Sequence, residues 1–103
     1  MFTGNEHHNI SIEDASELTA NYRSKNPDDR KGGFFGKAAL LSLLNQSNCV
    51  GIRFYYGLDA DYNKVLVLVG ADSSENDLIG DNLCMDMACP CPEQCGEDNV
   101  LNS

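Results

Sequence analysis

The stretch CVGIRFYYGLDADYNKVLVLVGA, residues 49–71, decides the fold. Its first part alternates apolar side chains with other residues, which is the period of a β-strand, at Val50, Ile52, Phe54 and Tyr56. Its last part, residues 64–71, is apolar on both faces, as is typical of a strand that is covered on both sides or central in its sheet. Residues 57–63 connect the two parts, so we expect an antiparallel hairpin with a long loop and strands at 49–56 and 64–71.

Two helices are expected before this hairpin. Ser11 and Asp14 have the spacing of a capping box, which begins a helix, and Pro27 ends it. Between them runs one narrow apolar stripe at helical spacing: Ile12, Ala15, Leu18, Thr19 and Tyr22. Residues 35–46 carry leucines on more than one face, which predicts a second helix that is buried on most sides. The residues between the helices, 27–33, read as a polar loop.

The expected fold class is α+β: two N-terminal helices packed on a small antiparallel sheet, with a third strand near residues 83–87 and an irregular, cysteine-rich acidic C-terminus. We expect one domain over residues 1–103, with a polar lead-in at 1–9 and the tail at 84–103. Two strands alone are marginal, so the apolar strand needs another neighbour. A third strand or a second subunit can supply it, and we expect a homo-oligomer, most simply a two-fold dimer.

The sequence resembles a group of small bacterial proteins of uncharacterised function. The resemblance is carried by NCVGIRFYYGLDADYNKVLVLVGAD at residues 48–72, by CPEQCG at 91–96 and by the helix-forming start ISIEDASELTANYR at 10–23. It covers most of residues 10–96 and rests on a GIR-x-Y-x-G strand, an LVLVG strand and a C-terminal CPxxC. It implies a shared fold and no activity. Cys91 and Cys95 belong to the shared pattern, whereas Cys84 and Cys89 do not.

The charge distribution limits the classes of partner. The net charge is −9, and residues 65–103 contain eight Asp and Glu but no Lys or Arg. Such a surface repels phosphate backbones and anionic lipids, so we expect neither nucleic acid nor a membrane as a partner. A basic protein partner is compatible with it. The first eight residues lack the features of a signal peptide and no apolar run approaches the ~20 residues of a membrane helix, so we expect a cytoplasmic location.

Four of the five cysteines lie in CMDMACPCPEQCGED, residues 84–98. Cys84, Cys89, Cys91 and Cys95 are the candidate metal ligands, for zinc or an iron–sulfur cluster. Their spacing, C-x4-C-x-C-x3-C, differs from the usual zinc and iron–sulfur spacings, and their acidic neighbours favour the neutral thiol. Free thiols, a metal site and disulfides all remain open. We expect Cys91 and Cys95 to be close in space because Pro92 favours a turn between them, and Cys89 and Cys91 not to be bonded to each other.

Other chemistry-bearing residues point to no catalytic site. His7 and His8 lie in the polar lead-in, and no hydrolase or nucleotide-binding motif occurs. Asp59 and the following acidic and amide residues resemble the opening of a calcium loop, but the pattern then fails, and we interpret them as turn formers. Tyr55 and Tyr56 are interpreted as cross-strand packing residues. We therefore expect a non-catalytic protein that acts through self-association or partner binding; the alternative is a small metal-binding protein that uses the C-terminal cysteines.

Overall fold

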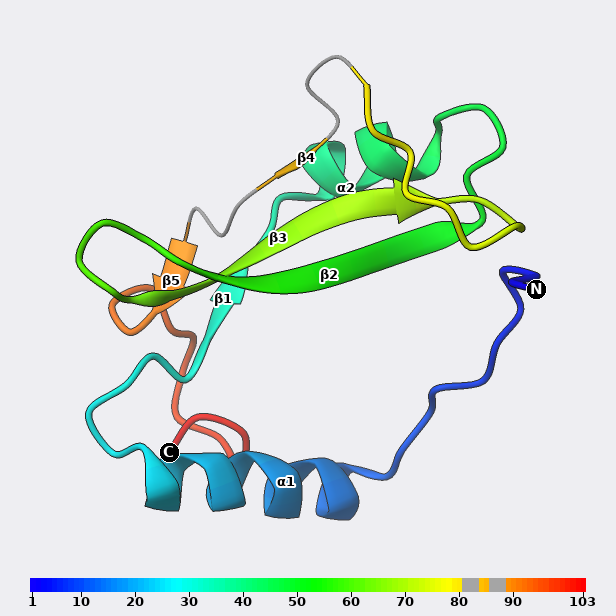
Figure 1. Cartoon of the computed structure of the whole chain (residues 1–103). Coiled ribbons are helices and arrows are strands. Elements are labelled where there is room, and N and C mark those ends of the chain that lie inside the picture. Colours follow the sequence, from blue (N-terminus) through cyan, green and yellow to red (C-terminus); the bar gives the residue numbers. More distant parts are fainter. Residues whose placement is uncertain (81–83, 86–88) are drawn as a thin grey trace. The chain divides into compact units, whose positions relative to one another are not determined.

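The computed structural model describes residues 1–80, 84–85 and 89–103, with Cys84 and Met85 described by their backbone alone (Figure 1). It confirms the α+β fold class, with two helices and two small antiparallel sheets. In the described part of the chain, no helix is long and apolar enough to cross a membrane. The elements are α1 (Ile12–Lys25), β1 (Gly32–Phe34), α2 (Lys37–Leu44), β2 (Gly51–Leu58), β3 (Lys64–Ala71), β4 (Cys84–Met85) and β5 (Cys89–Cys91).

The chain divides into two compact units. The described residues of Met1–His7 and Phe35–Met87 form the first, which we call the hairpin unit. Those of His8–Phe34 and Ala88–Ser103 form the second, which we call the disulfide unit. The sheet of strands β2, β3 and β4 with helix α2 belongs to the hairpin unit, and helix α1 with strands β1 and β5 belongs to the disulfide unit.

The hairpin of the first unit confirms the expected strand pairing. β2 and β3 are antiparallel, with Gly51 opposite Ala71 at one end and Leu58 opposite Lys64 at the other. β2 begins and ends two residues later than the alternation predicts. The expected third strand is present at β4, which pairs with β3 through Leu68 and Val69 only. The remaining residues of that prediction, 83, 86 and 87, lie outside the described residues.

The apolar core of the described residues lies under one end of the hairpin. It consists of Leu43, which is fully buried, with Leu68, Val69 and Ala71. The prediction that α2 is buried on most sides is wrong, because the helix meets the hairpin with one face and leaves Leu41 and Leu44 exposed. The approach is close: a Cβ built on Gly70 would lie 3.4 Å from the Leu43 carbonyl oxygen.

The loop of the hairpin is organised by Asp59. Its Oδ1 accepts hydrogen bonds from the backbone N–H groups of Asp61 and Asn63, both at 2.9 Å. Tyr62 takes up a left-handed conformation with φ of 63°. This confirms the turn-forming role predicted for these residues, because the backbone amides occupy the carboxylate oxygen that a calcium loop would offer to the ion.

The loop after β3 repeats this arrangement with a similar sequence. Asp72 Oδ1 accepts from the N–H groups of Ser74 at 3.0 Å and Asn76 at 2.9 Å, and Glu75 is left-handed with φ of 70°. Both loops therefore share an Asp in the first position and an Asn in the fifth. The second loop delivers Asp77 to the sheet, where it forms a bridge with Ala71.

The disulfide unit contains a strand pair that the sequence analysis did not predict. Helix α1 begins as expected, with Ser11 Oγ accepting from Asp14 N–H at 3.0 Å. β1 and β5 pair antiparallel, from Gly32 opposite Cys91 to Phe34 opposite Cys89. Glycines and prolines disfavour strands, so this pairing has almost no local signal and depends on contacts between distant segments.

Candidate functional site

The two faces of β2 carry different kinds of side chain. Side chains alternate along a strand, so Phe54, Tyr56 and Leu58 share one face, which we call the apolar row. Arg53 and Tyr55 lie on the other face. The hairpin unit therefore presents an apolar surface and a polar cluster back to back.

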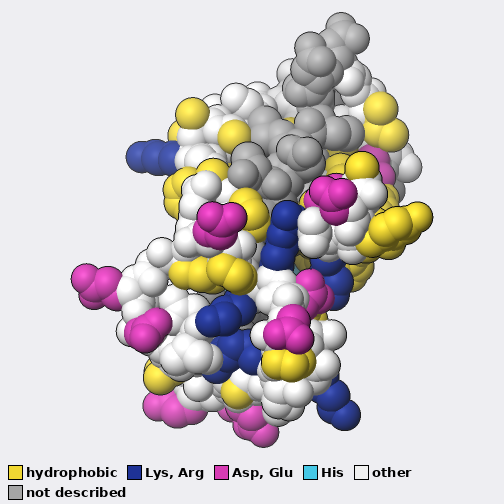
Figure 2. Space-filling model, turned by 90° about the vertical axis from the view of Figure 1, so that its left-hand side faces the viewer, with side chains coloured by type: hydrophobic (Ala, Val, Ile, Leu, Met, Phe, Trp, Pro, Cys, Tyr) yellow, Lys and Arg dark blue, Asp and Glu magenta, His cyan; other side chains and the backbone are white. Residues whose placement is uncertain are grey.

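The apolar row is exposed although its members are large and hydrophobic. Phe54 is 53% exposed, Tyr56 72% and Leu58 65%. The rings of Phe54 and Tyr56 meet edge to face, with centroids 5.6 Å apart, and Lys64 Nζ lies 5.9 Å from the Tyr56 centroid. Hydrophobic side chains also reach the surface on the face drawn in Figure 2. An exposed apolar surface of this kind marks an interaction site more often than isolated exposed residues do.

The exposure of the apolar row follows from the position of the core of the hairpin unit. Along β3, burial increases from Lys64, which is exposed, to the four residues Leu68–Ala71, which are buried. Helix α2 covers this buried end, as the close approach at Gly70 shows. The apolar row extends away from it towards the hairpin loop, and within the described residues of the hairpin unit no element covers that half of the sheet.

The open edge of β2 offers backbone groups beside the apolar row. Among the described strands, β2 pairs with β3 alone. The Gly70 carbonyl accepts from Leu78 N–H at 2.9 Å and therefore points away from β2. Opposed residues in an antiparallel ladder alternate between bonded pairs and pairs that point outward. Since Ile52 lies opposite Gly70, the residues Ile52, Phe54 and Tyr56 direct their backbone groups to the open edge.

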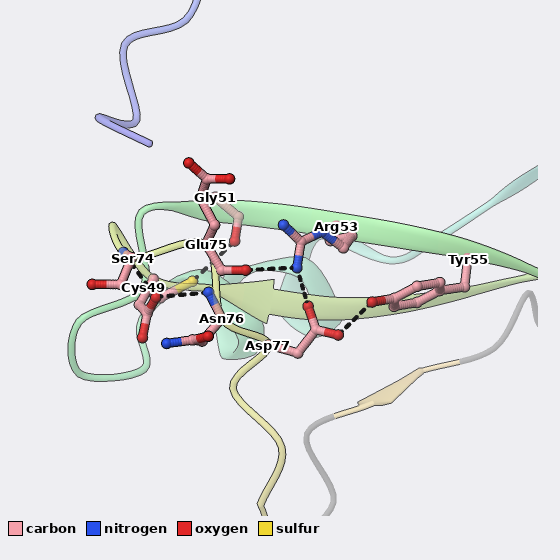
Figure 3. Close-up of polar contacts among 9 residues, drawn as sticks. Cys49, Gly51, Arg53, Tyr55, Ser74, Glu75, Asn76 and Asp77 are labelled. Atoms are coloured by element: carbon pink, nitrogen blue, oxygen red, sulfur yellow. Dashed lines mark hydrogen bonds and ion pairs between the residues drawn. The ribbon is translucent and has the colours of Figure 1, made fainter. Parts of the chain in front are cut away.

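The polar cluster on the other face is centred on Asp77 (Figure 3). Asp77 accepts a hydrogen bond from the Tyr55 hydroxyl at 2.5 Å and forms an ion pair with Arg53. Arg53 also donates to the Glu75 carbonyl at 3.1 Å, and its guanidinium carbon lies 5.4 Å from the centroid of the Phe2 ring. The sequence carries no signal for this cluster, because Asp77 is more than twenty residues from both partners.

The electrostatics of the cluster keep its groups in their ordinary charge states. The hydrogen bond from Tyr55 is the main cause of the lowered pKa of Asp77, and the same bond raises the pKa of Tyr55. The hydrogen bond to Asp77 raises the pKa of Arg53. Each pKa moves away from neutral pH, whereas general acid–base catalysis is most efficient with a pKa near the working pH. The arrangement supports a structural role: the cluster holds the loop at residues 72–76 on the sheet.

The cysteines are arranged in part as the sequence predicts. Cys91 and Cys95 form a disulfide with Cα atoms 4.8 Å apart, which confirms that they are close in space. Cys89 is a free thiol, which confirms that it is not bonded to Cys91, and Cys49 is free as well. The side chain of Cys84 lies outside the described residues.

The expected metal site remains a prediction. Within the described residues, no group of three or more His, Cys, Asp or Glu side chains is placed to hold a metal ion. Two of the four predicted ligands, Cys91 and Cys95, are bonded to each other, and a disulfide offers no thiolate to a metal. A metal site at these cysteines therefore requires reduction first.

Comparison with other proteins supplies no family for this arrangement: no protein-family model, curated protein or solved structure matches the chain. The resemblance to the group of small bacterial proteins therefore stays an expectation.

Proposed function

We propose that this protein acts without catalysis, by association of its hairpin with a second copy of the chain. The observation that supports this most directly is the apolar row, Phe54, Tyr56 and Leu58, exposed beside the open edge of β2. Strand addition from a second copy satisfies the outward backbone groups and buries part of the apolar side chains against those of the second copy. Both gains occur at the same place, because the row and the edge belong to one strand.

The sequence of β2 is complementary to itself in an antiparallel pairing. When two copies pair about Tyr55, Phe54 of one copy lies opposite Tyr56 of the second, and Ile52 lies opposite Leu58. The two Phe54–Tyr56 pairs then form a cluster of four rings on one face of a continuous sheet. On the other face Arg53 lies opposite Gly57, so no like charges meet across the interface.

The charge of the chain favours this strand over other surfaces as the contact between copies. A net charge of −9 repels a second copy over most of the molecule. β2 contains no acidic residue, and its single charged residue, Arg53, is neutralised by Asp77. Pairing at β2 therefore brings no carboxylate of one strand against a carboxylate of the other. A basic protein partner, by contrast, is attracted to the acidic surfaces elsewhere.

Light scattering across a concentration series tests this proposal. We expect the mass to rise from 11.3 kDa towards twice that value as the concentration increases. The substitution Tyr56→Lys places a charge in the row at the open edge, and we expect it to weaken the dimer by about tenfold or more. Tyr62→Lys is the matched control, because Tyr62 is an exposed tyrosine of the same hairpin, at its loop, and we expect it to leave the dimer unchanged.

The salt dependence of association distinguishes self-association from binding of a basic protein. Self-association of an acidic chain becomes tighter as salt screens the net repulsion, whereas binding of a basic protein becomes weaker. A folded wild-type protein that keeps the monomer mass at millimolar concentration and high salt contradicts self-association. Equal weakening by Tyr56→Lys and Tyr62→Lys contradicts the assignment of the interface to β2.

A further inference from the structure

The disulfide unit lacks an apolar core of its own. All four core residues of the described chain, Leu43, Leu68, Val69 and Ala71, belong to the hairpin unit. Helix α1 has no buried residue, and every residue of β1 is exposed. Burial of apolar side chains normally contributes most to the stability of a folded unit. The disulfide unit must therefore depend on its polar contacts and on the Cys91–Cys95 bond.

The polar contacts tie the C-terminal segment, residues 97–103, to α1 and the loop after it. Three side chains donate to backbone carbonyls of this segment: Ser16 to Val100 at 3.3 Å, Arg23 to Leu101 at 2.6 Å and Lys31 to Asn102 at 2.6 Å. All three bonds are exposed to water, where a hydrogen bond contributes little net stability. They hold the segment only while the chain that leads to it is already in place.

The disulfide lies where the chain leaves strand β5 and continues to the C-terminal segment. Cys91 is the last residue of β5 and is half-buried, and its carbonyl accepts from Lys31 N–H at 2.5 Å. Cys95 is exposed, and within the loop that the bond closes, Gln94 N–H donates to the Pro90 carbonyl at 2.9 Å. The bond therefore restricts the path from β5 to the C-terminal segment, and one of its sulfur atoms belongs to a residue that a small thiol can reach.

We propose that Cys91–Cys95 is a reversible redox site whose reduction by low-molecular-weight thiols releases the C-terminal segment from α1. A thiolate attacks Sγ of Cys95; a mixed disulfide forms there, the Cys91–Cys95 bond breaks, and the electron pair leaves on Cys91, which takes a proton from water. A second thiolate attacks the small-molecule sulfur of the mixed disulfide and frees Cys95, which is protonated in turn. Two small thiols become one small disulfide, and the protein gains two thiols.

The charges around Cys95 select the class of thiol. Glu93, Glu97 and Asp98 are exposed within four residues of Cys95. Two basic side chains of the unit, Arg23 and Lys31, bond to residues 97–103, but the unit as a whole contains eight Asp and Glu against four Lys and Arg. The net charge of the unit is negative, so it repels an anionic thiolate more than one without net charge. The attacking form of 3-mercaptopropionate is a dianion and that of cysteamine is a zwitterion without net charge, so we expect the repulsion to slow 3-mercaptopropionate alone. Added salt is expected to speed 3-mercaptopropionate and to leave cysteamine nearly unchanged.

Hydrogen exchange read by mass spectrometry tests the structural consequence. We expect reduction with cysteamine to speed exchange at least about tenfold in α1 and residues 97–103, and to leave β2 and β3 unchanged, because their core is separate. The double variant Cys91→Ser/Cys95→Ser is expected to show the reduced pattern without any reductant. Cys49→Ser is the matched control: it removes a free thiol and is expected to keep the response to reduction.

Thiol titration and kinetics supply the outcomes that overturn the proposal. Five titrating thiols in protein purified without reductant and oxidised in air show that the bond does not form. Identical exchange before and after reduction shows that the bond does not hold the segment. Salt effects of equal size for both reductants show that the acidic residues do not select the thiol. Each result is independent of whether the hairpin associates with a second copy.

Discussion

At the scale of single residues, Asp77 is the group on which the polar face of the hairpin depends. It joins Tyr55 and Arg53 from β2 to the end of the loop at residues 72–76. Its lowered pKa means that the cluster contributes stability above the ordinary pKa of an Asp, about 3.9, and loses it as the pH falls through the lower folded value. The raised pKa of Tyr55 has the opposite sign: its contribution is present below about 10 and is lost as the pH rises through the higher folded value.

Removal of the Tyr55 hydroxyl should be visible at Asp77. Since the hydrogen bond from Tyr55 is the main cause of the low pKa of Asp77, we expect Tyr55→Phe to raise that pKa towards its ordinary value. A carboxyl NMR titration measures it directly. Tyr62→Phe removes a hydroxyl from the same hairpin, outside the cluster, and is expected to leave the pKa unchanged. An unchanged Asp77 pKa in Tyr55→Phe would show that Arg53 alone sets it.

At the scale of elements, the position of α2 on the hairpin depends on a glycine. A Cβ at Gly70 would lie 2.8 Å from Gln46 Nε2 and 3.0 Å from Cys49 Sγ, as well as near the Leu43 carbonyl. A side chain there displaces the Gln46 amide and Cys49 Sγ and fills the remaining space beside the Leu43 carbonyl. The buried and exposed halves of the hairpin therefore follow from where this one close approach occurs.

The substitution Gly70→Ala tests this close approach. We expect it to lower the free energy of unfolding by about 1–3 kcal/mol, because the extra methyl group overpacks the contact between helix and sheet. Gly51→Ala is the matched control in the neighbouring strand, since a Cβ there has nothing within 4 Å. Urea unfolding of both variants measures the difference. Equal stability of the two variants would mean that α2 adjusts to the methyl group without cost.

At the scale of the whole molecule, the charge asymmetry decides which partners can approach. All seven Lys and Arg residues lie in residues 1–64, so the last third of the chain presents carboxylates alone. Phosphate contacts by basic side chains supply nearly all of nonspecific nucleic-acid affinity. The acidic third cannot make such contacts, and it repels a nucleic acid that approaches the rest of the chain.

We accordingly predict that the protein does not bind nucleic acid at physiological salt. A gel-shift assay with duplex DNA and with single-stranded RNA at ~150 mM salt is expected to show no complex at micromolar protein. A complex formed at submicromolar concentration contradicts the prediction. The same assay at low salt serves as a control for weak attraction through the basic residues of the first part of the chain.

The features that the sequence alone determined are local ones. The hairpin follows from the alternation at residues 49–56 and the apolar run at 64–71, and the start of α1 follows from Ser11 and Asp14. Cys91 and Cys95 are close because only three residues, including Pro92, lie between them and leave them little freedom to separate. In each case the pattern lies within one continuous segment of the chain, so residue type and spacing carry the information.

Tertiary structure decided what depends on distant contacts. The pairing of β1 with β5 joins segments that lack strand propensity, and the contact of Tyr55 with Asp77 joins a strand to a loop 22 residues away. The exposure of the apolar row depends on how far α2 covers the sheet. Alternation shows that Phe54 and Tyr56 share a face. Whether that face is buried depends on which element packs on it. Here that element is α2, which approaches the hairpin at Gly70, at the opposite end from the apolar row.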